Sequence, residues 1–322
     1  MRPLASRLLD PIFPLAFGAP GFRLAARGFE PGDLDVDLTG RVCLVTGANA
    51  GIGRATAEAL AARGATVHLL CRDRARGEEA RADIAARTRA PGAVVLDVVD
   101  VADRAALRAY VAERAPPRVD VLVHNAGEYR TDRALTDDGF ERMLAVGYLG
   151  PWLLTSLLRE RLAASAPARV VVTSGIYHRR GRLDLADMNF AVRAWDPMAA
   201  NHQMQLARAS FAMELARRFD GAGVTVNAVH PGAVRTHAQD ALTGWQRALM
   251  DAVGSFVFVD PARGALPNLK LAGEAALAGV TGRYFDALEE AEPSPLARDR
   301  ALGEALWRWT EGALAPWTRA GG

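Results

Sequence analysis

The sequence predicts an α/β fold in which helices cover both faces of an open, doubly wound parallel sheet, all within a single domain. Two patterns support this prediction: short apolar runs rich in β-branched residues alternate with longer runs of helical composition, and a glycine-rich turn follows the first apolar run. The chain has 322 residues, half of them apolar, which is enough for one large buried core. We find no repeat or linker in the sequence, so one domain is expected.

The expected elements follow one another in a regular order. Strands are expected at residues 41–45, 66–70, 93–97, 119–123, 169–173 and 224–229, with a last edge strand at residues 282–286. Helices are expected at residues 54–63, 74–87, 103–113, 138–164 and 197–219. Right-handed crossovers between parallel strands would place these helices on both faces of the sheet.

The same pattern divides the chain. The parts are an N-terminal extension at residues 1–38, the α/β domain at residues 39–290 and a C-terminal helical tail at residues 291–322. Within the domain, residues 175–196 and 235–275 are expected to form the lid of a pocket. Pro11, Pro14 and Pro20 interrupt the apolar residues of the extension, so we expect neither a membrane span nor a signal peptide there. A tail packed across the domain surface is the preferred interpretation.

Charge and cysteine usage exclude several classes of protein. The formal net charge of +2 is spread along the chain without a basic stripe, so we expect no nucleic-acid partner. Cys43 and Cys71 fall in expected buried strands, which predicts neither a disulfide nor a metal site. Reduced thiols fit a reducing compartment, and a cytoplasmic protein is therefore expected.

The glycine-rich turn at residues 46–53 lies between the first expected strand and the first expected helix. Gly47 permits a tight turn, Gly51 lets the backbone approach a pyrophosphate, and Gly53 allows the helix to pack closely on the strand. Phosphates would meet the N-terminus of the helix, where unpaired N–H groups favour negative charge. This context predicts a Rossmann-like nucleotide cradle. Its members are Gly47, Asn49, Ala50, Gly51, Ile52 and Gly53.

Three further motifs agree with the cradle. They are Asp100-Val101 after the third strand, His124-Asn125-Ala126-Gly127 after the fourth, and Pro231-Gly232-Ala233-Val234-Arg235-Thr236 after the sixth. Together with the glycine turn, they resemble the short-chain dehydrogenase/reductase family, and in particular its retinol-dehydrogenase-like branch, over residues 40–290. The resemblance implies that Asp100 and Val101 lie beside an adenine ring. It also assigns to the cofactor site Asn125, Ala126, Gly127, Pro231, Gly232 and Thr236.

The end of the second strand indicates which nicotinamide cofactor the site prefers. An NAD enzyme usually places an acidic residue here, about 20 residues after the glycines, to bind the ribose 2′-hydroxyl. This chain has Arg72 instead, and a guanidinium can bind a 2′-phosphate through charge-assisted hydrogen bonds. Arg54, beside the glycine turn, can supply a second cation. We therefore expect NADP(H) rather than NAD(H).

At most one of the four residues that carry catalysis in the family remains in this chain. The resemblance implies a proton-donating tyrosine, a lysine four residues later on the same helix face, a serine that orients the substrate and an asparagine that completes the relay. Asn201 aligns with the tyrosine, Gln205 with the lysine and Gly147 with the asparagine. The serine position falls on Ser174 or Gly175. Independently of this alignment, no tyrosine of the chain has a lysine four residues after it.

Three hypotheses about function follow. The first is an oxidoreductase for a hydrophobic carbonyl or alcohol with another proton donor, because losing a general acid slows hydride transfer by about 10²–10⁴-fold without preventing it. The candidate donors are Tyr177, His178, Tyr148 and His202. The second is a non-redox catalyst of cyclisation, dehydration or isomerisation, in which Asn201 and Gln205 orient an oxygen or stabilise an oxyanion. The third is a catalytically inactive protein that binds NADPH.

The expected lid contains large apolar side chains, which favour a hydrophobic small molecule as the substrate. These side chains are Met188, Phe190, Trp195, Trp245, Phe256 and Phe258. A specialised metabolite would fit such a pocket. The family resemblance also implies a homodimer through the helices at residues 138–164 and 197–219.

Arg72→Ala tests the expected cofactor preference. Removing the guanidinium removes charge-assisted hydrogen bonds to the 2′-phosphate, so NADPH binding should weaken by about tenfold or more, whereas NADH binding should change little. Fluorescence titration with each cofactor measures both dissociation constants. Equal weakening of the two would contradict the assignment.

Overall fold

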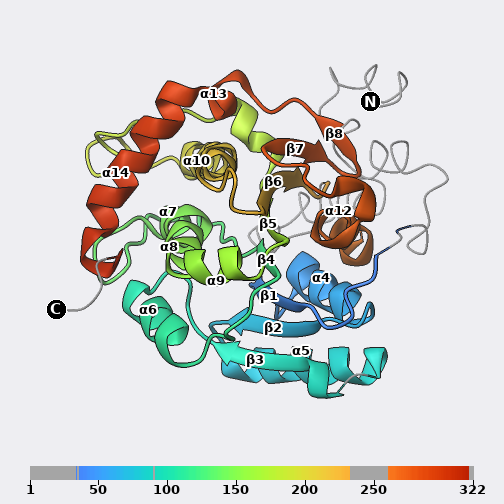
Figure 1. Ribbon diagram of the computed structural model, residues 1–322. Coiled ribbons are helices and arrows are strands. Elements are labelled where there is room, and N and C mark those ends of the chain that lie inside the picture. Colours follow the sequence, from blue (N-terminus) through green and yellow to red (C-terminus); the bar gives the residue numbers. More distant parts are fainter. Residues whose placement is uncertain (1–33, 35, 90, 233–259, 319–322) are drawn as a thin grey trace, which may run out of the picture.

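An eight-stranded sheet runs through the molecule (Figure 1). In this computed structural model the described residues are 34, 36–89, 91–232 and 260–318. The strands are β1 (Val42–Thr46), β2 (Thr66–Cys71), β3 (Val94–Val98), β4 (Val121–His124), β5 (Ala168–Thr173), β6 (Val224–His230), β7 (Arg283–Asp286) and β8 (Glu289–Ala291). Their order is β3-β2-β1-β4-β5-β6-β7-β8. The first seven strands in this order are all parallel, and β8 is antiparallel to β7.

This strand order confirms the doubly wound fold. The chain builds the sheet outward from β1 to β3 and then from β4 in the opposite direction, so the switch point lies between β1 and β4. The expected strand at residues 282–286 is present as β7, but it is not the edge of the sheet. A turn through Ala287, which has a positive φ of 53°, returns the chain and adds β8.

Helices cover both faces of the sheet (Figure 1). One face carries α4 (Gly51–Ala61), α5 (Arg74–Thr88) and α12 (Pro261–Gly273), and the other carries α6 (Arg104–Glu113), α7 (Arg142–Leu144), α8 (Gly150–Leu157), α9 (Arg159–Ala164) and α10 (Pro197–Arg218). Each face has its own apolar cluster, because alternate strand residues point to opposite faces. Leu44 and Leu122 belong to the cluster under α8 and α10, whereas Val45 and Val123 belong to the cluster under α4 and α12.

The helix expected over residues 138–164 begins later and is interrupted. The Glu141 carboxylate accepts hydrogen bonds from the N–H groups of Met143 and Leu144, which fixes the start of α7. A π-helical turn over Ala145–Leu149 then precedes α8, with the Gly150 N–H donating to the carbonyl five residues back. Pro151 lacks the N–H that a continuous α-helix would use at this point, so the sequence carried a signal for the interruption.

The C-terminal segment forms α13 (Pro295–Arg298) and α14 (Arg300–Thr318), and α14 packs against α8 and α10. The Trp307 ring lies 5.1 Å from the Trp152 ring and 6.2 Å from the Phe211 ring, measured between centroids. The Thr310 hydroxyl lies 2.6 Å from the Tyr148 hydroxyl. The chain's own helix therefore covers one side of the helices through which a homodimer is expected. A homodimer contact on that side of α8 and α10 would require α14 to detach from these two helices.

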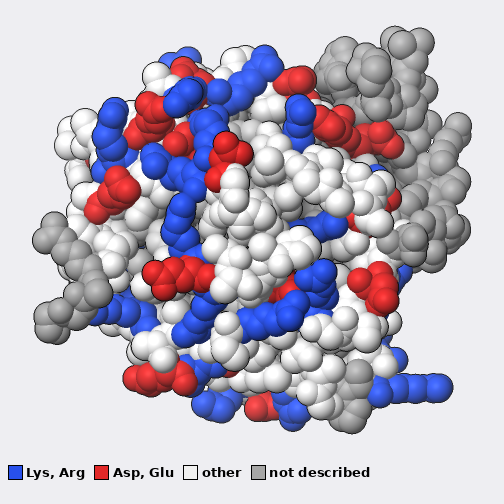
Figure 2. Space-filling model, in the orientation of Figure 1, with Lys and Arg blue, Asp and Glu red and all other residues white. Residues whose placement is uncertain are grey.

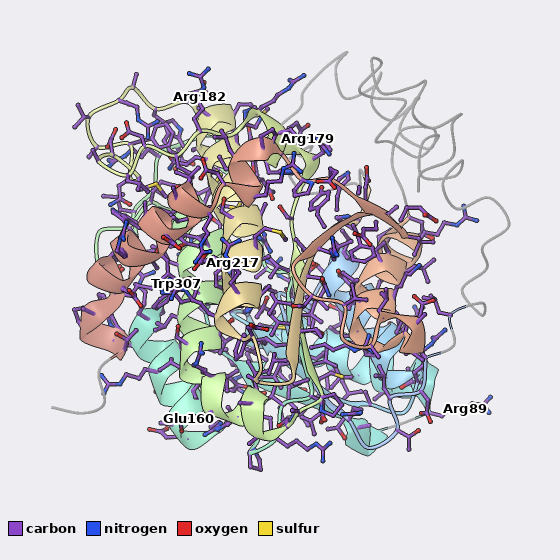
Figure 3. The ribbon with its side chains drawn as sticks, turned by 45° about the horizontal axis from the view of Figure 1, so that its top comes forward. Arg89, Glu160, Arg179, Arg182, Arg217 and Trp307 are labelled. Carbon is purple, nitrogen blue, oxygen red and sulfur yellow. The ribbon has the colours of Figure 1, made fainter. Side chains whose placement is uncertain are left out.

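The contact between α14 and α10 has a charged rim. The guanidinium of Arg218 lies 4.2 Å from the centre of the Trp307 ring, and Arg217, labelled with Trp307 in Figure 3, pairs with Glu214. Figure 2 shows basic and acidic side chains interspersed over this face. Arg217 and Glu214 both lie on α10, so their ion pair does not join the two helices, and the apolar contacts carry the attachment of α14. No helix of the described part of the chain combines the length and the apolar character that crossing a membrane requires.

Leu314→Ala tests the attachment of α14. Leu314 is fully buried against the α8–α10 side, so the substitution should lower the free energy of unfolding by about 2–5 kcal/mol. Leu296→Ala is the matched control, because Leu296 is 41% exposed and its truncation should cost about 0.5 kcal/mol or less. Urea denaturation measures both values. Equal small losses would show that α14 does not pack as described.

Candidate cofactor and active site

The turn between β1 and α4 has the backbone geometry of the expected cradle. Gly47 has a positive φ of 67°, and Gly51 has a positive φ of 53°. A Cβ on Gly53 would lie 2.3 Å from the Gly47 carbonyl oxygen and 2.4 Å from Asn125 Nδ2, so no larger residue fits there. A Cβ on Gly51 would meet no atom within 4 Å. The turn therefore packs tightly against protein atoms at Gly53, whereas Gly51 faces open space.

The N-terminus of α4 differs from those of four other helices that cover the sheet. Aspartate side chains accept backbone N–H groups at the starts of α5, α6, α10 and α12, namely Asp73, Asp103, Asp196 and Asp260. Ala50 stands at this position of α4, where no side chain accepts a hydrogen bond. The first N–H groups of α4 therefore keep their capacity to bind an anion, such as a phosphate.

Hydrogen bonds join the carboxyl ends of β1 and β4 across the switch point. Thr46 Oγ1 accepts from the N–H groups of Asn125 and Ala126, both at 3.0 Å, and donates to the Val123 carbonyl at 3.3 Å. Asn125 Nδ2 donates to the Thr46 carbonyl at 3.1 Å. The predicted Asn125-Ala126-Gly127 motif therefore holds the glycine turn in place from the neighbouring strand.

Carboxylates bind both arginines expected to recognise a 2′-phosphate. Arg72 is more than half exposed at the end of β2 and donates from Nη1 to Glu128 at 2.8 Å. Arg54 donates to Asp83 at 2.5 Å. Sequence reasoning missed Glu128, although it directly follows the His-Asn-Ala-Gly motif.

Glu128 also connects Arg72 to the residues after β3. Arg142 donates to Glu128 at 3.2 Å and to Asp100 at 3.1 Å. Asp100 accepts the N–H of Ala102 as well, and Val101 is buried beside it. Asp100 and Arg72 thus belong to one network of charged groups.

The residues aligned with the family's serine and lysine lie in contact. Gln205 Oε1 accepts the Gly175 N–H at 2.7 Å and lies 3.4 Å from the Ser174 hydroxyl. A Cβ on Gly175 would lie 3.1 Å from the Gln205 side chain. The structure therefore brings Ser174, Gly175 and Gln205 together and directs the Gln205 amide at the end of β5.

A methionine fills the space beside the position aligned with the family's asparagine. A Cβ on Gly147 would lie 2.3 Å from Met204 Sδ, and Met204 is buried. An asparagine at position 147 would require Met204 to move. Sequence reasoning missed Met204, which stands next to Gln205 on α10.

Two of the candidate proton donors belong to the core. Burial raises the pKa of Tyr148 well above its usual range, and its hydroxyl is bonded to Thr310. Burial lowers the pKa of His178 to about 4, so the ring is neutral at pH 7. His178 Nε2 accepts the Ser294 N–H at 3.1 Å, which leaves Nδ1 to donate to the Gly175 carbonyl at 2.8 Å. Tyr148 and His178 are therefore removed as candidate donors, because both side chains are committed to structural hydrogen bonds.

The other two candidate donors lie against each other. The Tyr177 and His202 rings are stacked, with centroids 5.2 Å apart and planes at 29°. Burial lowers the pKa of His202. Its Nε2 is buried and has no hydrogen-bond partner in the part of the chain that the structure describes. Asn201, aligned with the family's tyrosine, is the buried residue directly before His202.

The lid predictions fall partly outside the described residues. Thr236 and the aromatic residues Trp245, Phe256 and Phe258 lie there, as do residues 1–33 of the extension. Pro231 and Gly232 are buried at the end of β6, and Gly232 has a positive φ of 89°. Phe190 is buried, and the Trp195 ring packs on it at 5.5 Å.

Within the described ranges, the side chains that could bind a metal ion form no metal site. No three His, Cys, Asp or Glu side chains there are grouped to hold an ion. Cys43 and Cys71 are buried and unpaired, and burial raises the pKa of Cys71 to about 12. These thiols are therefore inert core residues at neutral pH.

Known proteins share this fold and much of this sequence. A family model described as enoyl-(acyl carrier protein) reductase matches residues 47–258. The chain belongs to the short-chain dehydrogenase/reductase family. Its similarity to curated proteins is to the retinol-dehydrogenase-like branch. It is 40% identical over 277 residues to retinol dehydrogenase 13 of Mus musculus, which covers 84% of this chain and 82% of that protein. It is 37% identical over 310 residues to retinol dehydrogenase 14 of Mus musculus, covering 92% and 91%.

Solved structures also superpose on the chain. An uncharacterized protein from Mycobacterium paratuberculosis has a TM-score of 0.73 at 30% identity, covering 89% of this chain and 97% of that one. A protein from Beutenbergia cavernae, described as an NAD(P) dependent gluconate 5-dehydrogenase with bound NADP, has a TM-score of 0.61 at 28% identity, covering 78% and 96%. The family expectation from the sequence motifs is confirmed.

The buried neutral His178 predicts a loss of stability in acid. Its pKa is about 4 in the folded chain against 6.5 when unperturbed, so between these values the unfolded chain binds a proton that the folded chain does not. The free energy of unfolding should therefore fall as the pH falls through this window, by about 1.4 kcal/mol per pH unit for this one group. Urea denaturation of the wild type and of His178→Asn between about pH 7 and pH 5 should give a shallower dependence for the variant. Parallel curves would contradict the assignment.

Proposed function

We propose that the protein is an NADP(H)-dependent oxidoreductase that acts on a hydrophobic carbonyl or alcohol with a non-standard proton donor. The observation that carries the proposal is the uncapped, glycine-lined start of α4, held to β4 by Thr46 and Asn125, with Arg72 at the end of β2. The family membership and the names of the retinol dehydrogenases support both the redox class and the apolar substrate.

The described residues fit a nicotinamide dinucleotide. The pyrophosphate would bind the N–H groups at the start of α4, where Gly51 leaves open space. The 2′-phosphate would bind the exposed side of Arg72, while Glu128 holds one edge of that guanidinium. The neighbour described with bound NADP supports this choice of cofactor.

The proposed proton source is Tyr177, with His202 stacked against its ring. NADPH, when bound, would supply the hydride for the substrate carbon, and the carbonyl oxygen would then need a proton. Tyr177 stands two residues after Gly175, so its hydroxyl is the acid nearest in sequence to the aligned serine position. Tyr177 follows β5 and His202 lies on α10, so the stacked Tyr177–His202 pair joins the end of β5 to α10. His202 directly follows Asn201 on that helix. Asn201 is proposed to orient the carbonyl oxygen through its amide.

A second candidate is a protein that binds NADPH without turning it over. The observation that favours it is the commitment of the residues at the catalytic positions to each other: Gln205 binds Gly175, and Met204 fills the space beside Gly147. In this case the cradle would serve binding or regulation. Turnover experiments separate the two candidates.

The test measures NADPH absorbance and product together with a panel of apolar aldehydes and ketones. Oxidation of NADPH matched by alcohol formation supports the oxidoreductase. Product without NADPH oxidation supports a non-redox catalyst instead. Tight NADPH binding without any product supports the binding protein.

Tyr177→Phe tests the proton source. The substitution should lower kcat by about 10²–10⁴-fold and leave the NADPH dissociation constant nearly unchanged. Tyr148→Phe is the matched control, since it removes the same hydroxyl from a core residue and should leave kcat within about threefold. Equal rates for Tyr177→Phe and the wild type would exclude Tyr177 as the donor.

A further inference from the structure

Arg208 is a buried arginine with no carboxylate partner in the described structure. It lies on α10 and is 3% exposed. Nη2 donates to the His124 carbonyl at 2.9 Å, and Nη1 donates to the Ala126 carbonyl at 3.2 Å. Its Nε has no hydrogen-bond partner within the described residues. Burial lowers the pKa of Arg208 to about 10, so the guanidinium is still charged at pH 7.

A charge in this position is costly, because its bonds to two neutral carbonyls do not neutralise it. A neutral amide could donate to the same carbonyls without that cost. The backbone role alone therefore does not account for an arginine. A ligand whose charge the guanidinium attracts or repels would account for the arginine.

The guanidinium lies between the cradle and the aligned catalytic positions. His124 and Ala126 flank Asn125, which binds the glycine turn. A Cβ on Gly127 would lie 3.5 Å from Arg208 Nη1. On α10, Arg208 follows Gln205 by three residues, so the two share a helix face. Gln205 is neutral where the family's lysine would carry a positive charge, and Arg208 carries one three residues further along.

The strand order indicates which half of a dinucleotide lies on this side. Arg72 at the end of β2 would bind the adenosine 2′-phosphate, and the pyrophosphate would cross the switch point at α4. The nicotinamide half would then lie over the ends of β4, β5 and β6. Arg208 supports the end of β4 in that region.

We propose that Arg208 is a specificity-determining residue that makes the site prefer the reduced cofactor NADPH to NADP⁺. The inference rests on the proposed NADP(H) site. The nicotinamide ring carries a positive charge in NADP⁺ and none in NADPH, so a fixed cation nearby repels only the oxidised ring. Attraction of Arg208 to the phosphates is nearly the same for both forms and cancels in the ratio of their dissociation constants.

The test is calorimetric titration of the purified full chain with NADPH and with NADP⁺. In the wild type, NADPH should bind more tightly by about five- to twentyfold, as expected for one charge acting at close range in a partly shielded site. Arg208→Gln keeps a donor for the carbonyls and removes the charge, so the ratio should approach one. Arg208→Lys keeps the charge and should retain most of the preference.

Arg217→Met is the control for total charge. Arg217 lies on the same helix, but it pairs with Glu214 at the rim of the α14 contact. Its loss should leave the ratio unchanged. A wild-type chain that binds NADP⁺ as tightly as NADPH overturns the inference without any variant, so a misfolded Arg208→Gln protein does not leave it undecided.

The outcomes separate this inference from the proposed function. If neither cofactor binds the wild type, the NADP(H) site itself is wrong and the inference falls with it. If both bind and Arg208→Gln leaves the wild-type ratio unchanged, the site stands and the role of Arg208 is overturned. A merely structural Arg208 would change stability without changing the ratio.

Discussion

The rest of the site depends on the hydrogen bonds between Thr46 and Asn125. They join the carboxyl ends of β1 and β4, the two central strands from which the chain builds the sheet in opposite directions. Asn125 also fills the space beside Gly53, so contacts within the protein support the glycine turn. Preorganisation of this kind lowers the entropic cost of binding.

Three residues of α10 contact the positions around the candidate active site. Met204, Gln205 and Arg208 lie on successive parts of one helix and contact Gly147, Gly175 and the end of β4, respectively. These contacts pack α10 closely against the helix turn at Gly147 and against the ends of β4 and β5.

Periodicity was sufficient to predict the sheet. Buried parallel strands must be short apolar runs and crossover helices must be amphipathic, so the six strands from β1 to β6 could be predicted from the pattern alone. The glycine turn was also predictable, because its backbone requirements restrict residue type. The strand β8 was missed, because its acidic residues carry no apolar pattern. The burial of Tyr148 under α14 could not be predicted either, since it depends on a contact 162 residues away in sequence.

Electrostatic partners were the least predictable part of the site. Glu128 and Arg208 have no local pattern, and their meaning appears only once β4, α10 and the end of β2 are placed together. The central claim is that the turn after β1 binds a nicotinamide dinucleotide. Calorimetric titration of the full chain with NADPH tests it most directly. Saturable one-to-one binding is the predicted result, and the absence of any binding heat at saturating NADPH concentrations, with the chain folded, would contradict it.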